Sequence, residues 1–165
     1  PKENILGNIG KGFKQFLKTL TIGRISISSL ALGTATGAYE LALKYSQERT
    51  AFGKQISSFQ GISFKLADMA TQISASRQLI YHAAWLHDNN KDVIKDAAIA
   101  KLFSSEAAMK ITTEAIQIHG GYGYIEDYHV ERFFRDAKIL EIGEGTSEVQ
   151  RIVIAREILK NFSNT

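Results

Sequence analysis

Residues 57–86, with the sequence SSFQGISFKLADMATQISASRQLIYHAAWL, decide the fold class of this chain. Apolar or small side chains recur in the stretch at alternating steps of three and four residues, which is typical of a helix packed in a bundle. They are Phe59, Ile62, Leu66, Met69, Ile73, Ser76, Ile80 and Ala83. Ser57 and Gln60 have the spacing of a capping box, so the sequence predicts one long helix that starts near Ser57.

Three more long helices are predicted around this stretch. The segment 93–118 has a similar stripe of smaller side chains, which are Val93, Ala97, Ala100, Ser104, Ala107, Ile111, Ala115 and Ile118. The segment 24–48 is apolar or small on nearly every side, so we expect it to be largely buried. The last helix is expected to begin near Thr146 or Ser147, where Ser147 and Gln150 again match a capping box.

The helix breakers support this interpretation. Pro1 is the only proline, so the strongest breaker is absent from the rest of the chain. Glycines cluster between the helical segments, and a short additional helix is predicted near residues 130–137. The fold class is therefore expected to be all-α, an up-and-down four-helix bundle with a short extra helix between the third and last long helices.

The composition is that of one globular domain. The chain has 165 residues, 44% hydrophobic and 22% charged, which excludes a disordered chain. The net charge of +3 is interleaved along the chain and no apolar run is long enough for a membrane span, so we expect neither nucleic-acid binding nor a membrane span. Residues 1–12 are expected to be a linker from a preceding domain, and residues 13–165 to form the bundle domain.

The chain contains no cysteine. This excludes a disulfide scaffold, a thiolate metal site and a cysteine nucleophile. It also fits a reducing compartment, so the expected location is the cytoplasm, or the mitochondrial matrix for a eukaryotic source.

Glu144 is the first candidate functional residue. It stands between Gly143 and Gly145, directly before the last predicted helix. An acid at this place can stabilise the positive end of the helix dipole, by ~0.3–1 kcal/mol. A carboxylate whose two neighbours lack side chains can also be presented to a flat substrate or cofactor as a general base. Spacing alone favours the helix-dipole role.

A basic and aromatic turn separates the first two helices. It contains Arg49, Phe52, Gly53 and Lys54. The turn is either a solvated loop with Phe52 packed into the end of the bundle, or an anion site, because an arginine beside a helix start suits phosphate.

A glycine-rich run ends the third helix. It contains Gln117, His119, Gly120, Gly121 and Gly123. A glycine there is a normal helix C-cap, and a pair of glycines also lets a nucleotide lie against the backbone. No strand precedes the run, so it does not match the dinucleotide-binding fingerprint.

No metal site is predicted from the histidines, which are His82, His87, His119 and His129. The first two are five residues apart, so they do not share a helix face. Structural roles are expected for two further pairs of residues. Ion pairs of Arg135 and Asp136 would hold the less regular region 119–145, and Tyr81 and Trp85 would lie in the core or at the bundle edge.

A series of short motifs runs along the chain in a characteristic order. The motifs are Gly12-Phe13-Lys14, Gly23-Arg24-Ile25, the segment from Tyr45 to Lys54, Phe59-Gln60, Leu66-Ala67-Asp68-Met69, the segment from Ala115 to Gly123, Arg135-Asp136-Ala137-Lys138, and the segment from Glu144 to Arg151. Each motif is weak alone. In this order they resemble the C-terminal helical domain of the acyl-CoA dehydrogenase family, over nearly the whole chain.

The resemblance implies FAD-dependent dehydrogenation of an acyl-CoA thioester at its α and β carbons. Glu144 would remove the α-proton while the β-hydrogen leaves as hydride to FAD. Arg24 and Gly145 would contact the substrate. The positions that match FAD contacts, several of them to the flavin of a neighbouring subunit, are Arg49, Thr50, Phe52, Phe59, Gln60, Gln117, Gly120, Gly121, Thr146 and Glu148.

The implied partners are the acyl-CoA substrate, an electron-transferring flavoprotein as electron acceptor, and other copies of the chain in a homo-dimer or homo-tetramer. Members of the family also use an N-terminal helical domain and a small β-domain, which 165 residues cannot hold. The isolated chain is therefore expected to fold, to bind FAD weakly and to be inactive. An acyl-CoA oxidase or nitroalkane oxidase on the same fold, and a non-catalytic helical interaction module, are the alternatives.

Three positions depart from common patterns in the family. Thr21 stands where many members have an aspartate that helps to hold CoA. Gly23 stands where members with a relocated base have a glutamate. Gly143 replaces a tyrosine that is common before the base, which is expected to widen the acyl pocket.

Overall fold

The structure, a computed structural model, describes residues 1–162 and contains five α-helices within them. These are α1 (Gly12–Glu48), α2 (Gln60–Asp88), α3 (Ile94–His119), α4 (Val130–Ile142) and α5 (Ser147–Phe162). Two short strands, β1 (Thr50–Ala51) and β2 (Lys54–Gln55), pair antiparallel between α1 and α2. The 3-10 helices are η1 (Lys2–Asn4), η2 (Ile56–Ser58), η3 (Gly120–Tyr124) and η4 (Glu126–Tyr128). The expected domain end at Thr165 lies outside the described residues.

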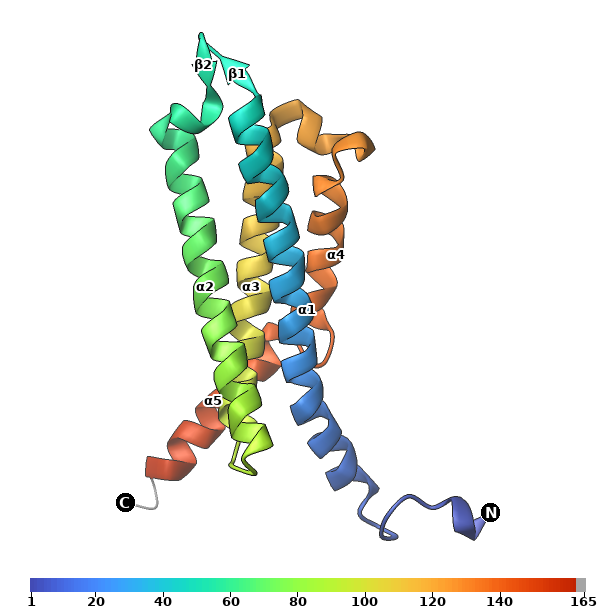
Figure 1. The fold of residues 1–165 in the computed structure, drawn as a ribbon. Helices are drawn as coiled ribbons and strands as arrows, with labels where there is room; N and C mark the ends of the chain where they lie inside the picture. Colours follow the sequence, from blue (N-terminus) through green and yellow to red (C-terminus); the bar gives the residue numbers. More distant parts are fainter. Residues whose placement is uncertain (163–165) are drawn as a thin grey trace.

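The helices pack around α3, which contacts α1, α2, α4 and α5. Figure 1 shows α1 to α4 running side by side, while α5 turns away at the end of the bundle opposite the β1–β2 hairpin. The prediction of an all-α bundle is confirmed, and α4 is the short helix between α3 and α5. None of the helices in residues 1–162 is long and apolar enough to cross a membrane.

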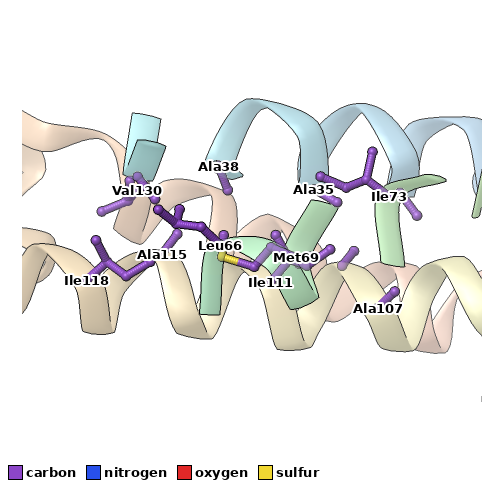
Figure 2. Close-up of a cluster of buried hydrophobic side chains, with 14 of the residues drawn as sticks. Ala35, Ala38, Leu66, Met69, Ile73, Ala107, Ile111, Ala115, Ile118 and Val130 are labelled. Carbon is purple, nitrogen blue, oxygen red and sulfur yellow. The ribbon is translucent and has the colours of Figure 1, made fainter. Parts of the chain in front are cut away.

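Small side chains bring α1 and α3 close together. The main core cluster contains Ala31, Ala35, Ala38 and Ala42 from α1 opposite alanines of α3, while α2 adds Leu66, Met69 and Ile73 (Figure 2). Alanine has no atoms beyond Cβ, so the helix backbones can approach closely. All eight stripe residues predicted for the third helix are buried. In the stripe of α2, Phe59 and Ile62 are half-buried and the other six are buried.

Both predicted capping boxes are wrong. Helix α2 begins at Gln60 with Phe59 at its N-cap and no side-chain cap, because Ser57 is still part of the 3-10 turn η2. At α5, the Val149 amide donates to the Thr146 hydroxyl at 3.4 Å. The Ser147 hydroxyl is buried without a hydrogen-bond partner among the described residues.

The first helix differs from its prediction at its start and in its burial. It begins at Gly12 rather than near Arg24. Its first turns expose Phe13, Phe16 and Leu17, so they carry no buried stripe that periodicity could detect. The expectation that the segment 24–48 is largely buried is wrong, since only seven of its residues are buried and Leu30 is 56% exposed.

The structure decides where three of the side chains with expected structural roles lie. Tyr81 is 62% exposed and Trp85 is half exposed, so of the two expected places, the core and the bundle edge, the core is excluded. Lys91 covers the Trp85 ring, with its Nζ 4.3 Å from the ring centroid. Arg135 pairs with Glu131 one turn earlier in α4, at 2.7 Å, so the expected ion pair of Arg135 lies within the region 119–145.

Candidate active site

The segment 143–146, here called the base loop, connects α4 to α5. Two consecutive residues in it have left-handed backbone conformations, Glu144 with φ +56° and Gly145 with φ +95°. A non-glycine residue in this region costs ~1–2 kcal/mol, so surrounding contacts must stabilise Glu144 there. A Cβ on Gly145 would lie 2.8 Å from Gln150 Nε2 and 3.2 Å from Val149 Cγ1, so the tight turn also needs a glycine for space.

Two buried side chains, Lys101 and Gln150, hold the base loop by hydrogen bonds to its backbone. Lys101 Nζ and Gln150 Nε2 each donate to the Gly145 carbonyl at 2.8 Å, and Gln150 also donates to the Glu144 carbonyl at 3.3 Å. Burial lowers the pKa of the Lys101 ammonium, and the charge of Glu141 acts in the opposite direction. Sequence reasoning missed Lys101, although it falls on the buried face of α3 between Ala97 and Ser104, where a lysine is unusual.

The Glu144 carboxylate lies over Gly23 of α1. A Cβ on Gly23 would be only 2.7 Å from Glu144 Oε2, so the missing side chain leaves the space that the carboxylate uses. Within residues 1–162, Glu144 has no ion-pair partner within 4.0 Å. The carboxylate is therefore not part of the salt bridges that hold the bundle together.

Arg24 follows Gly23 and is buried beside the same carboxylate. Burial lowers the pKa of its guanidinium, the neighbouring Arg156 cation lowers it further, and the Glu144 carboxylate raises it. The Arg24 Nε has no hydrogen-bond partner in the part of the chain that the structure describes. The site thus holds a buried cation with an unused donor next to a half-buried carboxylate, which suits a polar ligand.

Glu148 fits the helix-dipole role better than Glu144. It is exposed in the first turn of α5. A hydrogen bond from the Thr146 hydroxyl lowers the pKa of the Glu148 carboxyl, and its own backbone N–H lowers it further. The Glu144 side chain faces α1 instead, so its position needs another explanation.

Glu144, Gly145 and Arg24 line a groove of about 810 Å³, which we call the Glu144 groove. It is bounded by the first half of α1, the turn between α2 and α3, and the start of α5. Apolar side chains such as Leu17, Leu20 and Ile22 form much of its lining, and most of its charged side chains are basic, namely Lys11, Lys14, Lys18, Arg24, Lys91 and Arg156. Opposing them are Asp92 and Glu144, so the groove suits a ligand that carries several negative charges.

A second pocket, of about 530 Å³, lies at the hairpin end of the bundle. Its lining includes Arg49, Gln117, Gly120 and Gly121, four of the residues matched to FAD contacts. A Cβ on either glycine would meet nothing within 4 Å, so their backbone is open to a ligand. The Arg49 guanidinium lies 5.7 Å from the Tyr122 ring centroid. These groups fit the nucleotide part of FAD, which offers phosphates and a flat base.

His119 belongs to the wall of this hairpin-end pocket. Its ring stacks on Tyr45 with centroids 4.3 Å apart, and its Nδ1 lies 2.8 Å from the Ala115 carbonyl oxygen. Burial lowers the pKa of the imidazole, while the hydrogen bond to Ala115 opposes the shift. The histidine is therefore part of a packed aromatic cluster rather than a free acid or base.

The hairpin presents Phe52 to solvent. Phe52 (φ +52°) and Gly53 (φ +79°) form the turn between β1 and β2, and Phe52 is 96% exposed. The interpretation that Phe52 packs into the end of the bundle is therefore wrong. Its ring makes a T-shaped contact with Phe59, with centroids 6.2 Å apart, and Lys54 covers the Phe59 ring.

The predicted site residues fall into two groups at opposite ends of the bundle. Lys101 contacts the base loop and Gln117 lines the hairpin-end pocket. The two positions are 16 residues apart on α3, so at a rise of 1.5 Å per residue they are separated by about 24 Å. Thr146 and Glu148 lie with Glu144, whereas Arg49, Thr50, Phe52, Phe59, Gln60, Gln117, Gly120 and Gly121 lie toward the hairpin.

The comparisons with known proteins agree on one family. Residues 10–159 match the sequence model described as "Acyl-CoA dehydrogenase, C-terminal domain". The chain is 59% identical over 160 residues to the probable acyl-CoA dehydrogenase YngJ of Bacillus subtilis (strain 168), which covers 97% of this chain and 42% of that protein. It is 50% identical over 160 residues to the caffeyl-CoA reductase-Etf complex subunit CarC of Acetobacterium woodii, with the same two coverages.

Solved structures give the same result. The butyryl-CoA dehydrogenase of Megasphaera elsdenii matches with a TM-score of 0.95 and 53% sequence identity, over 96% of this chain and 42% of that one. The chain therefore spans about two fifths of the length of these relatives.

Proposed function

This chain belongs to the acyl-CoA dehydrogenase family, and on that premise we propose that it is the C-terminal domain of an FAD-dependent enzyme that dehydrogenates acyl-CoA thioesters. One observation carries the proposal. The Glu144 carboxylate lies over Gly23 beside the buried Arg24, in a groove whose charged side chains are mostly cations. A base and an anion-binding surface in one groove fit a substrate that joins a weakly acidic carbon to a phosphate-rich carrier.

Glu144 is the residue that takes the α-proton. The proton next to a thioester carbonyl is acidic enough for a positioned carboxylate, whereas an isolated alkane C–H is not. Bound FAD would supply the acceptor for the β-hydrogen, which leaves as hydride. Arg24 and Gly145 border the carboxylate and orient the substrate against it. The basic rim of the groove holds the phosphates of the CoA moiety.

The two groups of FAD-matching residues act in different flavin sites. A distance of about 24 Å along α3 separates the base loop from the hairpin-end pocket. The hairpin end would hold the nucleotide of a flavin whose reactive ring faces the Glu144 groove of another subunit. This arrangement supports a homo-dimer or homo-tetramer, because each flavin would then need residues from two copies.

An electron-transferring flavoprotein is the proposed electron acceptor. The support is that CarC, one of the similar proteins, is described as a subunit of a complex with Etf. Butyryl-CoA is the first substrate to test, because the solved relative is described as a butyryl-CoA dehydrogenase.

The test is Glu144→Gln in the full-length protein that contains this chain, with Glu40→Gln as a control on an exposed part of α1. Butyryl-CoA should bleach the flavin absorbance of the wild type and of the control, and solvent deuterium should enter the α-carbon. In Glu144→Gln the rates of flavin bleaching and of deuterium incorporation should both fall by about 10²-fold or more, because a general base contributes that much to the rate. Retention of both signals in Glu144→Gln would show that another group is the base.

A further inference from the structure

The Glu144 and Gly145 carbonyls of the base loop face buried donors. The Gly145 carbonyl accepts from Lys101 and Gln150, both at 2.8 Å, and the Glu144 carbonyl accepts from Gln150 at 3.3 Å. Lys101 and Gln150 are each 0% exposed, and Lys101 is the largest fully buried side chain described. The donors come from α3 and α5, so the loop is held from two helices.

A buried ammonium is costly, because the charge loses its water. Packing alone would be served better by methionine or leucine at position 101. In residues 1–162, Lys101 has no ion-pair partner within 4.0 Å. Charges that act on it from farther away are those of Glu141, Glu106 and Glu148, which favour the ammonium, and Arg24, which opposes it. Its hydrogen bond to Gly145 is thus the short-range contact that distinguishes it from an apolar residue.

The same hydrogen bonds bear on the backbone of Glu144. A left-handed non-glycine residue persists only where its surroundings determine it. If the Glu144 and Gly145 carbonyls lost their donors, the loop could relax toward a more common conformation, and the carboxylate would leave its place over Gly23. The position of the Glu144 carboxylate therefore depends on the hydrogen bonds from Lys101 and Gln150.

We propose that Lys101 and Gln150 are positioning residues that hold the Glu144 carboxylate in the groove by donating to the carbonyls of Glu144 and Gly145. This inference rests on the proposed function of Glu144 as the base. It assigns to Lys101 a role in proton abstraction although its ammonium is covered by protein.

The experiment compares Lys101→Met and Gln150→Met with the wild type in the full-length protein. Lys110→Met is the matched control, since Lys110 is an exposed lysine on the same helix. The quantities measured are kcat and KM for butyryl-CoA and the rate at which solvent deuterium enters the α-carbon. Both test variants should lower kcat and the exchange rate, by up to about 100-fold for a base displaced by about 1 Å, with KM changed far less. Lys110→Met should match the wild type.

Two outcomes overturn the proposal. In the first, Lys101→Met folds and has the same kcat and exchange rate as the control. In the second, the test variants raise KM while kcat stays constant. If Lys101→Met does not fold, Gln150→Met decides by the same criteria, because it removes the other donor to Gly145. Glu144→Gln in the same assay separates this inference from the proposed function. If Glu144→Gln abolishes exchange and both methionine variants retain it, only the positioning role fails. If Glu144→Gln retains exchange, the proposed function fails.

Discussion

The contact between Gly23 and Glu144 predicts that Gly23→Ala will raise the stability of the folded protein and lower its activity. An alanine at position 23 would place its Cβ 2.7 Å from Glu144 Oε2 and 3.2 Å from the Cδ of the same side chain. An ordinary contact begins near 3.4 Å, so the carboxylate must move by at least about 0.7 Å. The side chain that must yield is the flexible end of a glutamate, so the helix itself can accept the methyl group.

The two consequences have different magnitudes. Replacing a glycine inside a helix by alanine stabilises the folded state by about 0.5–1 kcal/mol, because the unfolded chain loses freedom. A base displaced by about 1 Å loses up to about 100-fold in rate. Gly23→Ala should therefore unfold at a slightly higher temperature than the wild type while its kcat falls by one to two orders of magnitude.

Gly33→Ala is the matched control, because Gly33 lies on the same helix and a Cβ there would meet nothing within 4 Å. Both variants are compared with the wild type in the full-length protein by thermal unfolding and by kcat for butyryl-CoA. The control should gain stability without losing activity. If Gly23→Ala is as active as Gly33→Ala, the Glu144 carboxylate does not work from its position over Gly23, and the geometric argument is refuted.

Two further predictions concern stability. Gly37→Ala should lower the free energy of unfolding by about 1 kcal/mol in urea unfolding, because its Cβ would lie 2.9 Å from the Phe133 ring. The cost of this overpacking outweighs the stability gained by replacing a glycine in a helix with alanine. Equal stability of Gly37→Ala and Gly33→Ala would contradict this prediction. The pKa of His119 is lowered by burial, so the unfolded chain takes up the proton first as the pH falls below 6.5, and stability should decrease there. His119→Gln should show a smaller decrease over the same pH range in urea titrations, whereas an unchanged pH slope would exclude His119 as its source.

The helices of this protein could be predicted from its periodicity wherever a helix has one buried face. The stripe from Val93 to Ile118 is buried throughout, and the α2 stripe is buried from Leu66 onward. Periodicity did not predict the first turns of α1, because these turns bury no stripe. Residue spacing predicted both capping boxes wrongly, because the local turn decides which hydroxyl reaches an amide. The sequence pattern also overestimated the burial of α1, because small residues such as alanine and serine suit close packing but do not require it.

The order of the motifs along the sequence by itself determined the family, and with it Glu144 as the leading candidate base. Only the tertiary structure decided what surrounds that carboxylate. Gly23 and Glu144 are far apart in the chain, and so are Lys101 and Gly145, yet each pair is in contact. Such contacts depend on how whole helices pack, which no local pattern encodes. The packing also separates the base loop from the hairpin-end pocket along α3, because a helix is rigid and its length fixes the distance between its ends.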